Sequence, residues 1–276
     1  MKNPLFKSAW ALACTAGAVL LVACDEPEDA PMAPQDALQE QLSPVPDHAR
    51  DLFVELGYDA NDVVMEGDNY LLQNDIVVTP DALAEMAEEL TSNGPAEEQY
   101  RTSNLVRRLP RTIRVRGTNL TDKMSRALNR AINNYNDLGL RIRFRRVNQN
   151  ANITVRRVNQ LSSAARAGFP SNGNPFNLVR IRADLNSLSI NTLEHVITHE
   201  LGHTVGLRHT DWFDRSFSCG GDPVREPGLP GETPRAIHIQ GTPTGFDANS
   251  VMNSCFSSQE SGNFSANDRR ALNRVY

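Results

Sequence analysis

Residues 195–211 read HVITHELGHTVGLRHTD and contain four of the six histidines of the chain. Residues four positions apart share one face of a helix, so His199 and His203 can direct their imidazoles to one point. Gly206 lets the chain leave the helix with a positive φ, and His209 can then return to the same point. The pattern H-E-x-x-H-x-x-G-x-x-H therefore predicts one Zn²⁺ ion bound by His199, His203 and His209.

Three neutral imidazoles leave the fourth position of the ion to water, as in catalytic zinc sites and unlike closed structural ones. Glu200 follows His199 directly, so we predict that Glu200 is the general base that takes a proton from this water. His195 lies one turn before His199 on the same face. We interpret His195 as a packing or supporting residue, because the motif needs no fourth histidine.

The 276 residues carry a net charge of −5 that is divided unevenly along the chain. Residues 25–100 contain 20 Asp and Glu but a single basic residue, Arg50, whereas residues 101–276 contain 25 Lys and Arg and 13 acids. The hydrophobic fraction of 39% is ordinary for a globular protein and excludes a chain that is disordered throughout. The sequence thus predicts an acidic region followed by a basic domain.

The N-terminus has the pattern of a targeting segment, which we assign to residues 1–23. Lys2 and Lys7 precede an apolar run, residues 9–22, that is too short for a comfortable membrane span but suits the core of a signal peptide. The run ends in Leu-Val-Ala-Cys24, which resembles the lipobox of bacterial lipoproteins. That resemblance implies lipidation of Cys24 and an exported protein anchored to the cell envelope, on the periplasmic face or the cell surface. An ordinary secretory signal is the alternative.

Two cysteines, Cys219 and Cys255, stay in the mature body after Cys14 leaves with the signal and Cys24 takes a lipid. In an oxidising compartment an isolated pair is more often bridged than free. We therefore predict a disulfide between Cys219 and Cys255.

Residues 24–47 are rich in Pro, Asp and Glu and have little apolar periodicity, which predicts a disordered tether. Residues 48–104 form an acidic α+β region that is a candidate pro-segment. We expect helices over residues 48–56 and 80–90, the second capped by Thr79, and a pair of strands within residues 70–78. Asn93-Gly94-Pro95 should stop the second helix.

Residues 105–276 should form the catalytic domain. Apolar and arginine residues alternate around residues 113–115, 142–145 and 153–156, which predicts strands with one apolar and one arginine-lined face. Thr121 is placed to cap a helix whose apolar residues recur at helical spacing. A further strand over residues 176–183 and a zinc helix over residues 193–207 complete an α+β fold with a mixed, twisted sheet and helices on one face.

The arginine-lined face invites three interpretations. Binding of nucleic acid is not predicted, because the sequence has no aromatic platform and no recognised binding module. A solvated sheet face is the default interpretation. The sharper hypothesis is that the acidic region docks on this face of the same chain, because opposite charges within one chain attract.

The segments HELGHTVGLRHTDW, residues 199–212, and GTPTG through SVMN, residues 241–253, resemble the bacterial HEIGH-type metallopeptidases of the metzincin clan. The resemblance covers residues 105–276. It implies a methionine turn beneath the metal, for which Met252 is the matching residue, and a closing C-terminal helix. Ser254 stands where some members have a tyrosine ligand. Residues 25–100 lack cysteine, which rules out cysteine-based latency; latency through an acidic side chain, or no latency, stays open.

These observations predict a zinc-dependent endopeptidase of the cell envelope that cleaves protein or peptide substrates. Two alternatives stay open at this stage. One is a lipoprotein that binds zinc but acts as a binding or adhesion module, which the intact Glu200 argues against. The other is a zinc hydrolase of a non-protein amide, for example in peptidoglycan.

Overall fold

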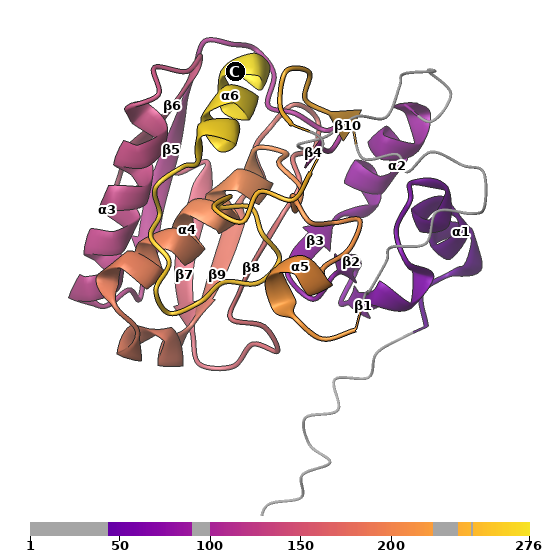
Figure 1. Cartoon of the computed structure of the whole chain (residues 1–276), viewed down its shortest axis with the longest axis horizontal. Helices are drawn as coiled ribbons and strands as arrows, with labels where there is room; N and C mark the ends of the chain where they lie inside the picture. The colour runs from indigo at the N-terminus through magenta and orange to yellow at the C-terminus, as the bar shows by residue number, and fades with distance from the viewer. Residues whose placement is uncertain (1–43, 90–99, 223–236, 244) are drawn as a thin grey trace, which may run out of the picture. The chain divides into compact units, whose positions relative to one another are not determined.

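The computed structural model describes residues 44–89, 100–222, 237–243 and 245–276 (Figure 1). The predicted signal peptide, Cys24 and most of the predicted tether lie outside these residues, as does the predicted stop at residues 93–95. No helix in the described part of the chain combines the length and the apolar character needed to cross a membrane.

Six α-helices, two 3₁₀ helices and ten strands make up the described residues. The helices are α1 (Asp47–Glu55), η2 (Ala60–Asp62), α2 (Pro80–Glu89), α3 (Asp122–Asn136), η3 (Ala183–Ser187), α4 (Ile190–Thr204), α5 (Ser216–Cys219) and α6 (Ala266–Val275). The strands are β1 (Val63–Glu66), β2 (Asn69–Leu72), β3 (Ile76–Val78), β4 (Tyr100–Arg101), β5 (Arg111–Thr118), β6 (Ile142–Arg146), β7 (Ile153–Val158), β8 (Ala165–Gly168), β9 (Leu178–Arg182) and β10 (Ile237–His238).

Eight strands form one mixed sheet in the order β1-β2-β3-β8-β9-β7-β5-β6. Strands β6, β5, β7 and β9 run parallel, β8 is antiparallel to β9, and β3 is parallel to β8. Strands β4 and β10 form a separate antiparallel pair. The mixed sheet expected from the sequence is confirmed, but β1 and β8 were not predicted.

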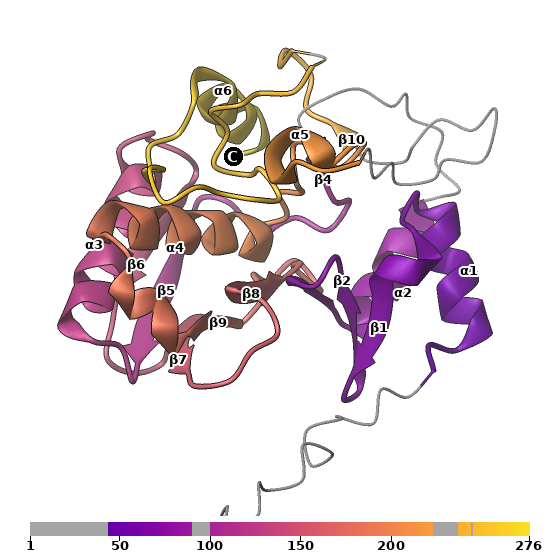
Figure 2. The ribbon, with the colours of Figure 1, turned by 60° about the horizontal axis from the view of Figure 1, so that its bottom comes forward.

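Helix α3 forms for the reasons that the sequence suggests. Thr121 caps its start by accepting a hydrogen bond from the Met124 amide at 3.2 Å, and Met124, Leu128 and Tyr135 on one face are fully buried. Helices α3 and α4 lie side by side on one face of strands β5 to β9 (Figure 2). The Tyr135 hydroxyl joins the two helices by donating to the carbonyl of Thr198 at 2.8 Å. Helix α3 therefore supports α4, the helix that carries the zinc motif.

The alternation of apolar and arginine residues along the strands gives the sheet a core face and a solvent face. Ile113, Val115, Ile142 and Phe144 are buried in the main core, whereas the arginines between them are exposed or half-buried. Acids of the N-terminal region pair instead with arginines elsewhere: Glu66 with Arg166 and Arg180, and Asp62 with Arg215.

The acidic region has a small core of its own. Phe53 and Leu72 are fully buried there, and Phe169, which follows β8, is part of the same cluster. Val45, which the sequence places in the tether, is buried in it as well. Thr79 caps α2 as expected, by accepting from the Ala82 amide at 3.1 Å. The region is therefore joined to the catalytic half by shared packing as well as by pairing of β3 with β8.

The junction between β3 and β8 depends on a glycine. A Cβ atom at Gly168 would clash with the carbonyl oxygen of Val77 and come within 2.9 Å of the Phe176 ring. The backbone of β3 can approach β8 this closely only because residue 168 has no side chain.

We expect Gly168→Ala to lower the free energy of unfolding by about 1–3 kcal/mol, the usual cost of forcing a methyl group into a packed site. Denaturant unfolding of the full chain measures this change. Gly245→Ala is the matched control, because a Cβ atom there meets no atom within 4 Å. Equal stability of the two variants would contradict the proposed steric role of Gly168.

Candidate metal centre

Helix α4 carries the first two histidines of the motif on one face. Its N-terminus is capped by Ser189, which accepts a hydrogen bond from the Thr192 amide at 3.1 Å. His199 and His203 lie one turn apart, and their Nε2 atoms are 2.9 Å apart. Both side chains are buried, so the helix delivers two imidazoles to a site within the protein.

Gly206 turns the chain so that His209 joins this pair. Its φ is +102°, and a Cβ atom here would lie 2.5 Å from the Asn104 carbonyl oxygen, so both conformation and space require glycine. The amide of Leu207 donates to the carbonyl of Gly202 at 3.0 Å and closes the helix. The Nε2 atom of His209 then lies 3.3 Å from that of His199.

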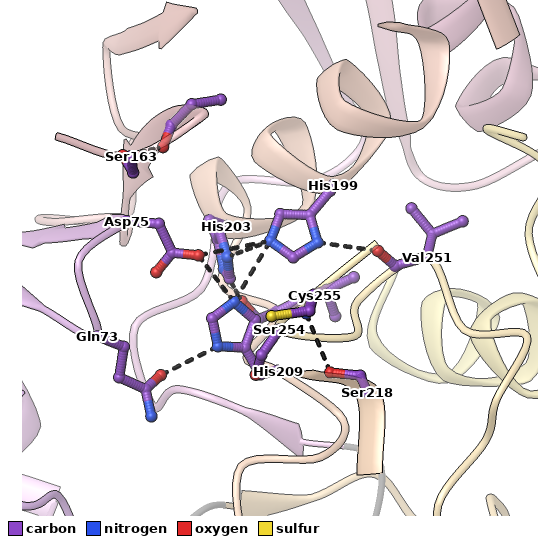
Figure 3. A network of polar contacts seen from close by, with 12 residues as sticks. Gln73, Asp75, Ser163, His199, His203, His209, Ser218, Val251, Ser254 and Cys255 are labelled. Carbon is purple, nitrogen blue, oxygen red and sulfur yellow. Dashed lines mark hydrogen bonds and ion pairs between the residues drawn. The ribbon is translucent and has the colours of Figure 1, made fainter. Parts of the chain in front are cut away.

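A hydrogen bond at the far nitrogen orients each of the three imidazoles, and Figure 3 shows those of His199 and His209. The acceptors are the carbonyl of Val251 for His199 at 2.8 Å, the carbonyl of Leu207 for His203 at 2.8 Å, and Oε1 of Gln73 for His209 at 3.0 Å. These oxygens only accept, so each Nδ1 carries the proton and each Nε2 presents a lone pair to the others.

Three converging lone pairs need a cation between them. A tetrahedral zinc ion with bonds of about 2.0–2.1 Å separates its nitrogen ligands by about 3.3 Å, close to the separations found here. Burial, followed by the neighbouring His199 and His209, lowers the pKa of His203 well below its usual value. A neutral imidazole is the form that binds metal, so the donor set fits zinc.

Asp75 is a fourth potential ligand that sequence reasoning did not identify. Its Oδ2 atom lies 3.1 Å from Nε2 of His209 and 3.9 Å from Nε2 of His199, and its side chain is 15% exposed (Figure 3). Burial opposes its charge, but His209 and then His199 hold its pKa below the usual value. Together with the three histidines, Asp75 forms a group of four donors whose ligand atoms lie within 4.8 Å of one another.

A tight turn between β2 and β3 places Asp75. Leu72 pairs with Ile76, so residues 73–75 form the loop, and its first two residues, Gln73 and Asn74, are left-handed, with φ angles of +54° and +68°. Asp75 follows them directly, and Gln73 holds His209 from the same turn. The only signal in the sequence was the Gln-Asn-Asp interruption within the expected strand pair.

Glu200, which directly follows His199 on α4, is buried, and its Oε2 atom has no hydrogen-bond partner within the described residues. Burial raises the pKa of Glu200 well above its usual value, the carboxylate of Asp75 raises it further, and Arg166 opposes both. Burial and the neighbouring Asp75 thus make this carboxylate more basic than a free one.

Met252 packs against the zinc helix from the side of the C-terminal segment. A Cβ atom at Gly202 would lie 2.5 Å from Sδ of Met252, so the glycine within the HELGH motif makes room for this methionine. The carboxylate of Asp268 accepts hydrogen bonds from the Val251 amide at 2.9 Å and from the Ser250 hydroxyl at 2.6 Å. Because Val251 also holds His199, Asp268 supports the first ligand indirectly.

The residues that follow His209 are hydrogen-bonded to residues 252–254. The Thr210 amide donates to the carbonyl of Met252 at 2.9 Å, and Asp211 accepts from the amide and hydroxyl of Ser254 at 2.9 and 2.8 Å. The structure joins Cys219 and Cys255 in a disulfide next to these contacts. His209 is therefore fixed by a network that spans about forty residues of sequence.

His195 lies outside the group of four donors. Its Nδ1 atom contacts the carbonyl of Ser261 at 3.0 Å, and burial, followed by His199, lowers its pKa to about 4. This neutral imidazole is packed near Phe256, with ring centroids 5.6 Å apart.

We expect Asp268→Ala to weaken both the fold and the metal site. It leaves the amides of Val251 and Ser265 without their acceptor, which should lower the free energy of unfolding by about 2–4 kcal/mol. Loss of the support for His199 should lower zinc affinity by about 10–100-fold. Thermal unfolding and zinc titration test this, with exposed Asp184→Ala as control. Unchanged zinc affinity in Asp268→Ala would show that the turn does not position His199.

Three solved structures are among those similar to the chain. A structure of myroilysin is 16% identical, covers 62% of this chain and 82% of its own, and has a TM-score of 0.41. A crystal structure of myroilysin is 15% identical, covers 73% and 98%, and has a TM-score of 0.42. High choriolytic enzyme 1, a hatching enzyme zinc-protease from Oryzias latipes, is 18% identical, covers 59% and 88%, and has a TM-score of 0.37. No curated protein matches the chain.

The family comparison covers most of the sequence. Residues 70–276 match the family described as dual-action HEIGH metallo-peptidase. The resemblance to HEIGH-type metallopeptidases expected from the sequence is thereby confirmed, and the group of three histidines and Asp75 fits the single zinc ion that such an enzyme needs. The chain belongs to the dual-action HEIGH metallo-peptidases and is a zinc metallopeptidase.

Proposed function

We propose that the chain is an endopeptidase in which His199, His203 and His209 hold zinc and Glu200 is the general base. One observation carries this proposal: three imidazole Nε2 atoms converge, and Glu200, which directly follows the first of these histidines on α4, is buried with a carboxylate oxygen that has no partner among the described residues. A buried carboxylate oxygen without a partner is costly, so its presence beside a metal site favours a chemical role.

The residues of the site divide the reaction between them. Zinc, when bound, lowers the pKa of water and polarises the carbonyl of the scissile peptide. Glu200 accepts the proton that this water loses as it attacks, and then donates the proton to the departing amine. The hydrogen bonds from Nδ1 of His199 to Val251 and from Nδ1 of His203 to Leu207 keep these imidazoles in place while the charge changes.

A specific observation favours a second candidate. Four protein ligands make a closed, structural zinc site, and Asp75 supplies a fourth donor. A chain with Asp75 permanently bound to zinc would be a binding or adhesion protein rather than a working peptidase. Zinc content and inhibitor binding of an Asp75→Ala variant separate the two.

We also propose that the acidic region docks on the basic half in the resting protein. Pairing of β3 with β8 and the ion pairs of Glu66 and Asp62 with arginines support this arrangement. Burial of Phe169 in the core of the acidic region supports it further.

We propose, finally, that the protein is exported and held at the cell envelope by a lipid on Cys24. The basic residues, apolar run and Cys24 at the N-terminus support this localisation. The disulfide between Cys219 and Cys255 supports an oxidising compartment, because such bonds are rare in the cytosol.

Glu200→Gln should lower the rate of peptide hydrolysis by a factor of about 10²–10⁴, because the variant keeps the shape of the side chain but cannot accept the proton. Zinc content should stay at one ion per chain, since the three histidines are intact. Hydrolysis of casein or a peptide library is measured in whichever form of the chain is active, and zinc by elemental analysis. Retention of more than a tenth of the activity would exclude Glu200 as the base.

Cys24→Ser should abolish incorporation of labelled fatty acid and release the protein from the membrane fraction of a bacterial host. A single acyl-bearing cysteine is the predicted anchor, so no other substitution is needed. Cys14→Ser is the control, because Cys14 lies within the segment that is removed. Lipid labelling that persists in the Cys24 variant would contradict the predicted anchor.

A further inference from the structure

We propose that residues 73–78 are a built-in inhibitory segment, with Asp75 closing the fourth position of the zinc site and β3 covering the strand that would bind a peptide. The enzyme works only when this segment leaves. The inference rests on the proposed function, because it assumes that the three histidines hold a catalytic zinc.

The first support is the place of Asp75. A catalytic zinc site has three protein ligands and an open position, and Asp75 lies with the histidines where a fourth ligand would lie. Its Oδ2 atom is 3.1 Å from Nε2 of His209. A carboxylate bound here excludes the water on which hydrolysis depends.

The second support is the strand that follows Asp75. The amide of Ala167 donates to the carbonyl of Asp75 at 3.0 Å, and the amide of Phe169 donates to the carbonyl of Val77 at 3.3 Å. Without β3, strand β8 would be the edge of the sheet and would expose these amides beside the metal site. An extended peptide pairs readily with such an edge, so β3 occupies the place of a substrate.

The third support is the way in which the segment is held. Glu66 at the end of β1 pairs with Arg166 on β8 and with Arg180 on β9. The side chain of Arg166 is only 4% exposed. These contacts bind the acidic region to the catalytic half without involving any metal ligand, so they can be weakened separately from the zinc site.

The buried Glu200 argues against Asp75 as a permanent ligand. A closed structural site has no use for a second carboxylate, yet Glu200 is 3% exposed and its Oε2 atom is unpartnered within the described residues. Burial of an unpartnered carboxylate oxygen costs free energy, which favours a role in the reaction over a structural role. The site therefore has the parts of an open catalytic centre together with a removable fourth ligand.

The closing experiment uses the full chain and two probes of the site. Acetohydroxamate binds zinc only where a coordination position is free, so we expect Asp75→Ala to bind it at least about tenfold more tightly than the wild type does. Both proteins should contain one zinc ion. Asp51→Ala is the control, because Asp51 is an exposed acid of α1, and it should bind acetohydroxamate as the wild type does.

A second variant tests the strand without touching the metal. Glu66→Gln should loosen the segment, so the amides of Ala167 and Phe169 should exchange their hydrogens several-fold faster, and a peptide hydroxamate should bind more tightly. The amide of Arg111, which donates to the carbonyl of Arg141, serves as an internal reference far along the sheet.

Each contrary result has its own meaning. Loss of zinc from Asp75→Ala would overturn the inference, since Asp75 would then be a permanent ligand. Unchanged affinity for acetohydroxamate in a zinc-loaded Asp75→Ala would also overturn it, as would unchanged amide exchange in Glu66→Gln. Failure of the proposed function has a different signature, because the wild type itself would then contain no stoichiometric zinc.

Discussion

The site depends on the hydrogen bonds that Nδ1 of each histidine donates to an oxygen. A histidine without such a bond could rotate or present either nitrogen, and only the metal would then hold its Nε2 atom toward the other two. The acceptors come from three separate parts of the chain, namely Leu207 in the motif itself, Val251 in the C-terminal segment and Gln73 in the acidic region. Two of these acceptors lie in the catalytic domain itself, and Gln73 adds the third while the acidic region is in place.

Several contacts outside α4 fix the position of the Val251 carbonyl, which orients His199. Asp268, in the first turn of α6, accepts a hydrogen bond from the Val251 amide. The Val251 carbonyl in turn accepts a hydrogen bond from His199. Because Gly202 has no side chain, Met252 can approach α4 closely, and this contact packs the C-terminal segment against the helix. Binding of zinc and packing of the C-terminal segment are thus one cooperative unit, since each supplies the contacts that orient the other.

Local patterns in the sequence predicted the elements whose contacts are local. The spacing of the histidines, the cap at Thr121 and the alternation in β5, β6 and β7 are complete within a few residues, and α3, α4 and these strands lie where expected. Asp75 and Gln73 were missed because both act on His209, which lies 136 positions after Gln73, and no local period records such a contact. The predicted zinc helix also began three residues late, because its first turn is capped by Ser189 rather than marked by apolar periodicity.

Strand β8 was not predicted because its residues are small, and the same small residues determine what can pair with it. Its sequence, Ala-Arg-Ala-Gly, lacks the large alternating residues that mark a strand, and all four residues are buried. Small side chains give little packing energy, but they let a second backbone approach closely, as Val77 does at Gly168. An edge that receives an extended chain needs this property more than it needs intrinsic strand propensity. The feature that hides β8 from sequence analysis is therefore the feature that suits it to bind either β3 or a peptide.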